Sequence, residues 1–102
     1  MKIIKKLSEM IEDEIKDAGK YARCALNHKE DHPALADLFY RLSGDELQHM
    51  NLLHEKVVDL IDDYREEHGE PPEAMKAVYD YLHEKQIDEA AEVKTLRAMY
   101  KE

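Results

Sequence analysis

Residues 45–50 read Asp-Glu-Leu-Gln-His-Met, and they place Glu46 and His49 three positions apart inside a long helical pattern. Residues at i and i+3 lie on the same face of a helix. The rest of that face is apolar, and the core positions expected on it are Leu35, Leu38, Phe39, Leu42, Met50, Leu53, Val57, Leu60, Ile61 and Tyr64. Burying an unpaired charge costs several kcal/mol or more, so the carboxylate and the imidazole need a partner. A metal ion suits both groups.

The composition is that of a helical protein with a charged surface. Of the 102 residues, 43% are apolar and 38% are charged, and there are only three Gly and three Pro. This length allows a single domain over residues 1–102. The formal net charge of −9 argues against binding to nucleic acid or to an anionic membrane by charge, and we expect neither partner.

Cysteine usage and hydropathy indicate a cytoplasmic protein. Cys24 is the only cysteine, so no disulfide can form within the chain, which fits a reducing compartment. The first residues are interrupted by Lys and do not predict a signal peptide. No apolar run approaches the roughly 18 residues that a membrane span needs.

Three helical segments are predicted, over residues 3–28, 33–67 and 72–100. The link at 29–32 is short and polar, and Pro33 after it suits the first turn of a helix. A link this short makes the first two helices antiparallel neighbours. Gly69, followed by Pro71 and Pro72, ends the second helix. The expected fold is all-α: a long antiparallel hairpin with a third helix.

Glu14 interrupts the apolar stripe of the first helix as Glu46 interrupts that of the second. The two residues are about equally far from the link, so they come to a similar height in an antiparallel hairpin. Together with His49 they offer two carboxylates and one imidazole, a ligand set that suits iron, manganese or zinc. The Glu-x-x-His spacing alone is a weak signal: Asp80 and His83 have the same spacing, and we interpret that pair as solvated. The position on the inner face is what distinguishes Glu46 and His49.

The arrangement of these residues resembles the half-ferritin hairpin of the ferritin-like superfamily, and within it the encapsulated ferritins. The resemblance covers roughly residues 8–60 and is carried by Glu14, by Tyr21 seven residues later, and by Glu46 and His49 after the Ala-Leu-Ala-Asp-Leu-Phe run at 34–39. It implies that Glu14, Glu46 and His49 are metal ligands and catalytic residues, and that Tyr21 lies beside the site. It also implies a di-iron centre shared by two chains, in which a homodimer or larger oligomer completes a four-helix bundle.

The function implied by this resemblance is the binding of iron and the oxidation of Fe(II), as a ferroxidase in iron storage or detoxification, with zinc or manganese as other metals for the site. The chain departs from the family in ending with a third helix where encapsulated ferritins carry a Gly/Leu-rich tail, so we expect no encapsulin shell as a partner. Lys16 and Lys20 also flank Glu14, where acidic residues would guide iron.

A second hypothesis needs no metal. Glu14, Glu46 and His49 would form a buried hydrogen-bonded cluster that fixes the register of the helices. The chain would then be a non-catalytic helical interaction module that docks through its third helix. Three further assignments stay open at this point: Tyr21 as core packing or as a hydroxyl near the site, His54 as a rim residue or an accessory ligand, and Glu89 as a residue that reaches the site from the third helix.

Overall fold

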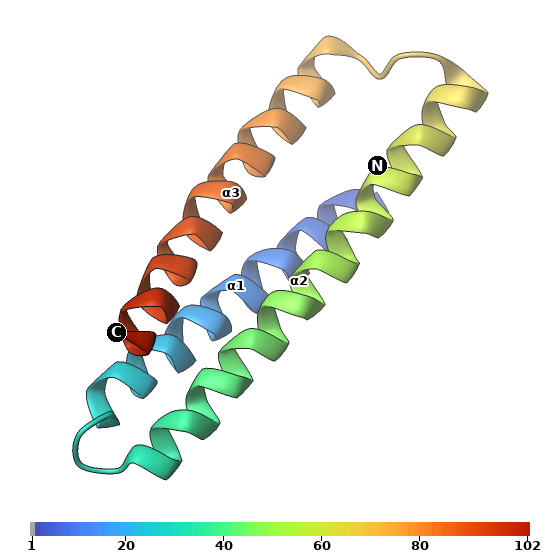
Figure 1. Ribbon diagram of the computed structural model, residues 1–102. Helices are drawn as coiled ribbons and strands as arrows, with labels where there is room; N and C mark the ends of the chain where they lie inside the picture. The colour runs from blue at the N-terminus through green and yellow to red at the C-terminus, as the bar shows by residue number, and fades with distance from the viewer. Residues whose placement is uncertain (1) are drawn as a thin grey trace.

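The computed structural model describes residues 2–102, which form three helices: α1 (Lys2–His28), α2 (Pro33–His68) and α3 (Glu73–Lys101) (Figure 1). These bounds confirm the three predicted segments to within one residue at each end. Residues 2–102 include no strand, which confirms the all-α class. None of the three helices combines the length and the apolar character needed to cross a membrane.

The ends of the helices follow the local signals in the sequence. The His32 N–H donates to the His28 carbonyl at 2.9 Å, which closes the turn after α1, and Pro33 occupies the first turn of α2. Gly69 has a φ of 77°, in the left-handed region that favours glycine, and its N–H donates to the Arg65 carbonyl at 2.9 Å. The predicted role of Gly69 as the end of α2 is confirmed.

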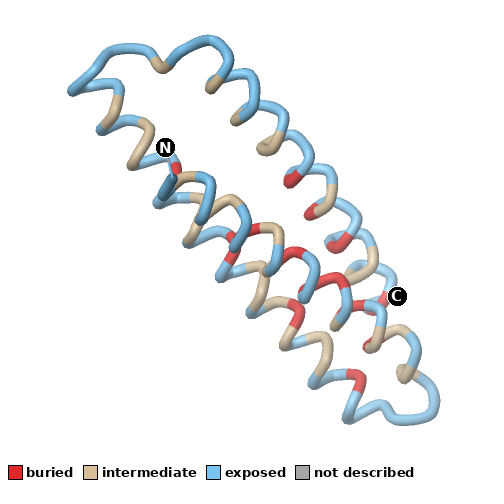
Figure 2. Tube along the Cα trace, turned by 180° about the vertical axis from the view of Figure 1, so that it is seen from behind, coloured by how far each residue is buried: buried red, intermediate tan, exposed pale blue. Residues whose placement is uncertain are grey.

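The three helices form an elongated molecule of 56 × 19 × 18 Å in which α1 packs against both of the others (Figure 1). Contact between α2 and α3 is limited to a few places. No residue from 58 to 85 is fully buried, so the end of the molecule that holds the α2–α3 connection is loosely packed (Figure 2). An apolar cavity of about 550 Å³, lined in part by Ile4, Ile61, Met75 and Tyr79, lies at that end.

The centre of the molecule is tightly packed because α1 presents small residues to its neighbours. Ala18, Ala22 and Ala25 are at most 1% exposed, and side chains this small let the neighbouring helices approach closely. Ile11 and Ile15 extend the same buried stripe toward the N-terminus of α1. The small side chains of this face therefore lie at close contacts between the helices.

Polar contacts fasten α3 to the other helices. The Tyr100 hydroxyl donates to Asp37 near the start of α2, and this hydrogen bond raises the pKa of Tyr100 to about 12. The amide of Gln86 donates to Ser8 Oγ of α1 at 2.8 Å. Gln86 interrupts the apolar stripe of α3, yet its side chain is buried, because Ser8 satisfies its amide.

The apolar face predicted for α2 is only partly buried within the chain. Leu35 and Leu38 are 40% and 46% exposed, and the buried residues of α2 are Ala36, Ser43, Met50 and Val57. The reason is that α3 packs mainly against α1 and touches α2 in only a few places. One side of the α1–α2 hairpin therefore remains open.

Candidate metal centre

Glu14 and Glu46 stand at the edges of the buried stripes of their helices. Glu14 lies three residues after buried Ile11, and Glu46 lies three residues after buried Ser43. Each glutamate therefore lies on nearly the same helix face as a buried residue, beside the α1–α2 contact. Their side chains are 25% and 20% exposed. His49 lies three residues further along α2, at the margin of the contact, and its side chain is 53% exposed.

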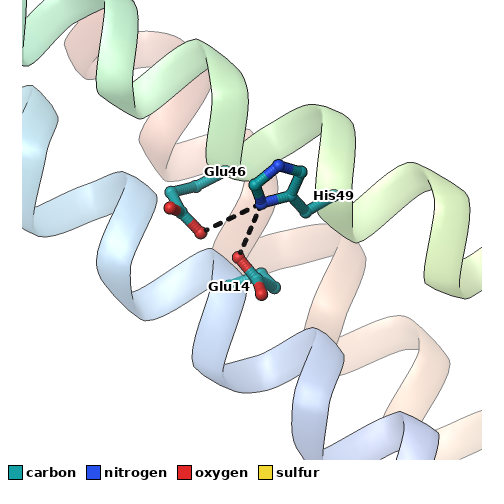
Figure 3. Close-up of side chains that lie close together, drawn as sticks. All are labelled: Glu14, Glu46 and His49. Carbon is teal, nitrogen blue, oxygen red and sulfur yellow. Dashed lines mark ion pairs between the residues drawn. The ribbon is translucent and has the colours of Figure 1, made fainter.

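The structure brings these three side chains together across the hairpin, as Figure 3 shows. His49 Nδ1 lies 3.5 Å from Glu14 Oε2 and 3.6 Å from Glu46 Oε2. One ligand atom from each residue can be chosen so that all three lie within 4.8 Å of one another. Among residues 2–102 they are the only group of three or more His, Cys, Asp or Glu side chains with that spacing. The sequence prediction that Glu14 and Glu46 meet at the same height is confirmed.

The cluster contains more negative charge than its own residues can satisfy. A single nitrogen, His49 Nδ1, faces two carboxylates at distances too long for good hydrogen bonds. Glu14 Oε2 is buried and has no hydrogen-bond partner among the described residues. Leaving a buried acceptor unsatisfied costs about 1–3 kcal/mol, and more for a charged group. A cation between the three side chains would remove this cost.

The donor set identifies the kind of cation that fits. Two carboxylates and one imidazole combine hard oxygen ligands with a borderline nitrogen, which suits iron, manganese or zinc. Calcium and magnesium prefer oxygen ligands alone. Three protein ligands also leave coordination positions for water, dioxygen or side chains of a second chain.

Ser43 holds the two helices in register beside the cluster. Its side chain is fully buried, and its hydroxyl donates to the carbonyl of Ala18 at 2.8 Å. Ala18 lies one turn after Glu14 and Ser43 one turn before Glu46, so this hydrogen bond fixes the hairpin next to the cluster. The adjacent Gly44 allows a close contact, since the Arg97 side chain of α3 lies against it. The hydrogen bond itself has no sequence signature.

Three other residues considered from the sequence do not join the cluster. Tyr21 is half-buried with its ring 6.2 Å from that of Phe39, and within residues 2–102 its hydroxyl makes no hydrogen bond to Glu14, Glu46 or His49. The packing interpretation of Tyr21 is therefore the one that the structure favours.

Glu89 and His54 have partners elsewhere. Glu89 is paired with Lys85 of its own helix at 3.7 Å. His54 contacts His83 of α3 at 3.1 Å; Asp80 is exposed as the interpretation of a solvated pair expects, but His83 is half-buried against His54. Neither Glu89 nor His54 belongs to the Glu14–Glu46–His49 group.

The sequence pattern suggested that the cluster lies in a closed core. The structure shows that it does not. His49 is more than half exposed, because α3 covers the other side of the hairpin and leaves this edge open. Exposed apolar side chains surround the edge: Met10 is one turn before Glu14 and 41% exposed, and Leu52 is three residues after His49 and 64% exposed. The candidate site is thus a half-open one with an apolar margin.

Comparisons with protein-family models, with curated proteins and with solved structures find no match to this chain. What the site can do is therefore argued from its own geometry and chemistry.

Proposed function

We propose that this chain is a ferritin-like iron protein whose Glu14, Glu46 and His49 form half of a di-iron carboxylate site. The observation that carries the proposal is the buried Oε2 of Glu14, which has no hydrogen-bond partner while it faces a second carboxylate and an imidazole. Two carboxylates and an imidazole with ligand atoms within 4.8 Å of one another are the arrangement expected of metal ligands.

A second copy of the chain would complete the site. Met10, Leu38 and Leu52 leave an apolar margin around the cluster (41%, 46% and 64% exposed), and a two-fold axis through this edge would cover it. Two copies would then supply four carboxylates and two imidazoles, the ligand set of ferritin-like di-iron bundles. The same contact would turn two hairpins into a four-helix bundle.

The proposed activity is the oxidation of ferrous iron. Two ferrous ions bound at the site would each give one electron to dioxygen, which leaves as hydrogen peroxide after taking up two protons. Glu14 and Glu46 would favour the more highly charged ferric product through their negative charge. His49 would hold iron through a neutral nitrogen, and the apolar margin would limit access of water.

The first experiment tests the ligands. Glu14→Ala, Glu46→Ala and His49→Ala are each expected to remove most of the bound iron, because each substitution deletes two ligands from a two-fold site. Asp45→Ala, which removes an exposed carboxylate next to Glu46, is the matched control and should bind iron as wild type does. Iron content per chain and near-ultraviolet absorbance after aerobic addition of Fe(II) are the two measurements.

The outcomes separate three functions. Loss of iron together with loss of rapid oxidation supports the ferroxidase proposal. Loss of iron from the variants, with no faster oxidation by wild type than in buffer, reduces the proposal to a metal carrier. Iron binding that survives all three substitutions would leave the helical interaction module, in which the same ion pairs of His49 fix the register of α1 and α2.

A second experiment tests the shared site. Leu52→Glu places a charge on the apolar margin without touching a ligand, so it should lower both the oligomer size and the iron content. Tyr81→Glu is the matched control, since Tyr81 is an equally exposed apolar residue on α3 (67%). Light scattering that finds wild type to be a 12 kDa monomer with iron bound would contradict the dimeric site.

A further inference from the structure

A pair of histidines joins α2 to α3, and it lies apart from the Glu14 cluster. His54 Nε2 and His83 Nδ1 are 3.1 Å apart, and the two ring planes differ by 19°. Both side chains are half-buried and line a cavity of about 300 Å³ with Asn51 and Gln86. Because α2 and α3 touch in few places, this pair is one of the few direct links between them.

The two rings are spaced as two ligands of one ion would be. Two Zn–N bonds of about 2.05 Å that meet at about 100–109° place the nitrogens about 3.1–3.3 Å apart and the ring centres about 4.9–5.2 Å apart. The observed separations are 3.1 Å and 4.8 Å. A straight N–H···N hydrogen bond of the same length would place the ring centres further apart, at about 5.4 Å. The N···N and ring-centre separations are therefore close to those of two imidazoles that bind one ion, in near-parallel rings that also meet the criteria of a hydrogen bond.

The surroundings keep the pair ready to bind a cation. Burial, and then the nearby His83, lower the pKa of His54, so its ring is neutral at neutral pH and can act as a ligand. The neighbouring Glu55 carboxylate opposes this lowering of the His54 pKa, but it is the smallest of the three effects. The ring of Tyr79 also stacks with that of His83, with ring centres 5.8 Å apart and planes 12° from parallel.

We propose that His54 and His83 form a second metal site, which binds a borderline divalent cation of the Zn²⁺ class and fastens α3 to α2. Imidazole suits zinc, copper and nickel, and the cavity beside the pair has room for water in the remaining coordination positions. Among residues 2–102 the pair has no third His, Cys, Asp or Glu ligand at metal-binding spacing, so the bound ion exchanges readily. This proposal does not depend on the iron site.

The test uses Zn²⁺ alone on protein whose first site has been removed. In a Glu46→Ala/His49→Ala background, calorimetric titration should find one Zn²⁺ per chain. Adding His54→Ala or His83→Ala should weaken this binding by at least about tenfold, since even residues that only support metal ligands are worth 10–100-fold. His68→Ala, which removes an exposed histidine at the end of α2, is the control and should leave the affinity unchanged.

A stability measurement gives a second readout. Zn²⁺ should raise the Tm of the Glu46→Ala/His49→Ala protein, and it should not do so once His54 is also replaced. If the replacement by Ala prevents folding, as judged by circular dichroism, His54→Gln serves instead. Absence of Zn²⁺ binding in the background protein, or binding that survives both His54→Ala and His83→Ala, would overturn the proposal and leave the pair as a hydrogen bond between helices.

Discussion

Replacing Glu14 by Gln should make the metal-free protein more stable, which is the opposite of what a structural cluster would show. The substitution keeps the shape of the side chain but removes a charge whose Oε2 is buried without a hydrogen-bond partner. It also gives the side chain an N–H₂ group that can donate to the carboxylate of Glu46. We therefore expect the repulsion between two neighbouring carboxylates to be relieved.

The size of the effect follows from two opposing contributions. An unsatisfied buried acceptor costs about 1–3 kcal/mol, and the substitution removes this cost. It also removes the ion pair with His49, which at 53% exposure of the imidazole is worth at most about 1 kcal/mol. The net gain is about 1 kcal/mol, and in a domain of this size 1 kcal/mol corresponds to a rise in Tm of about 4–8 °C.

The assay is urea unfolding followed by circular dichroism, in the presence of a chelator and at one fixed chain concentration, because dimerisation couples stability to concentration. Asp13→Asn, at the exposed neighbouring position, is the control and should change little. Adding metal should reverse the order, because a ligand at 100 times its Kd stabilises wild type by about 2.7 kcal/mol. A Glu14→Gln variant that is less stable than wild type by 1 kcal/mol or more without metal would refute the reasoning and favour the register-fixing cluster.

Three further predictions concern the rest of the fold. Burial lowers the pKa of His54, so the imidazole takes up a proton more readily in the unfolded chain than in the folded one. In chelator, the stability that neutral His54 contributes should be complete above about pH 6.5 and should fall as the pH is lowered. In urea unfolding at several pH values, His54→Gln should reduce this dependence of stability on pH. The hydrogen bond to Asp37 raises the pKa of Tyr100 to about 12, so absorbance titration should show one tyrosine that ionises late and is missing in Tyr100→Phe; its stabilising contribution should be lost as the pH rises toward that value. Ser43→Ala should cost about 1 kcal/mol by removing the buried hydrogen bond to α1, whereas Thr95→Ala, whose hydroxyl is exposed and bonds within its own helix, should change little in the same assay.

The helices and the meeting of the three ligands could be predicted because they depend on local and periodic signals. Helix ends followed from Pro33 and Gly69, and the similar height of Glu14 and Glu46 followed from counting residues on either side of a short link. These inferences need only helix geometry and an antiparallel hairpin. These inferences do not depend on where α3 packs.

The position of α3 could not be predicted, and the errors about burial follow from it. An apolar stripe shows that a helix packs, but not which of two neighbouring grooves it occupies. The pairing of His54 with His83 depends on that choice, because the two residues are 29 positions apart and neither lies in a motif. The exposure of His49 and Leu38 depends on it too, since a third helix on the other side of the hairpin would have covered both.

The position of α3 also explains why the edge with Glu14 and His49 stays open. Had α3 covered Glu14 and Glu46, two carboxylates would be sealed beneath a helix with only one imidazole beside them, at a cost of several kcal/mol. On the opposite side α3 can bury Gln86 against Ser8 and place Tyr100 against Asp37, so its polar groups are satisfied there. The edge that remains carries a buried oxygen of Glu14 that has no hydrogen-bond partner among the described residues, and exposed apolar side chains lie around it. An apolar partner alone would cover these side chains but leave the carboxylate charge uncompensated. The charge and the apolar side chains therefore both need a partner. A metal ion shared with a second copy of the same edge satisfies both, which is why metal binding and dimerisation are proposed here as one event.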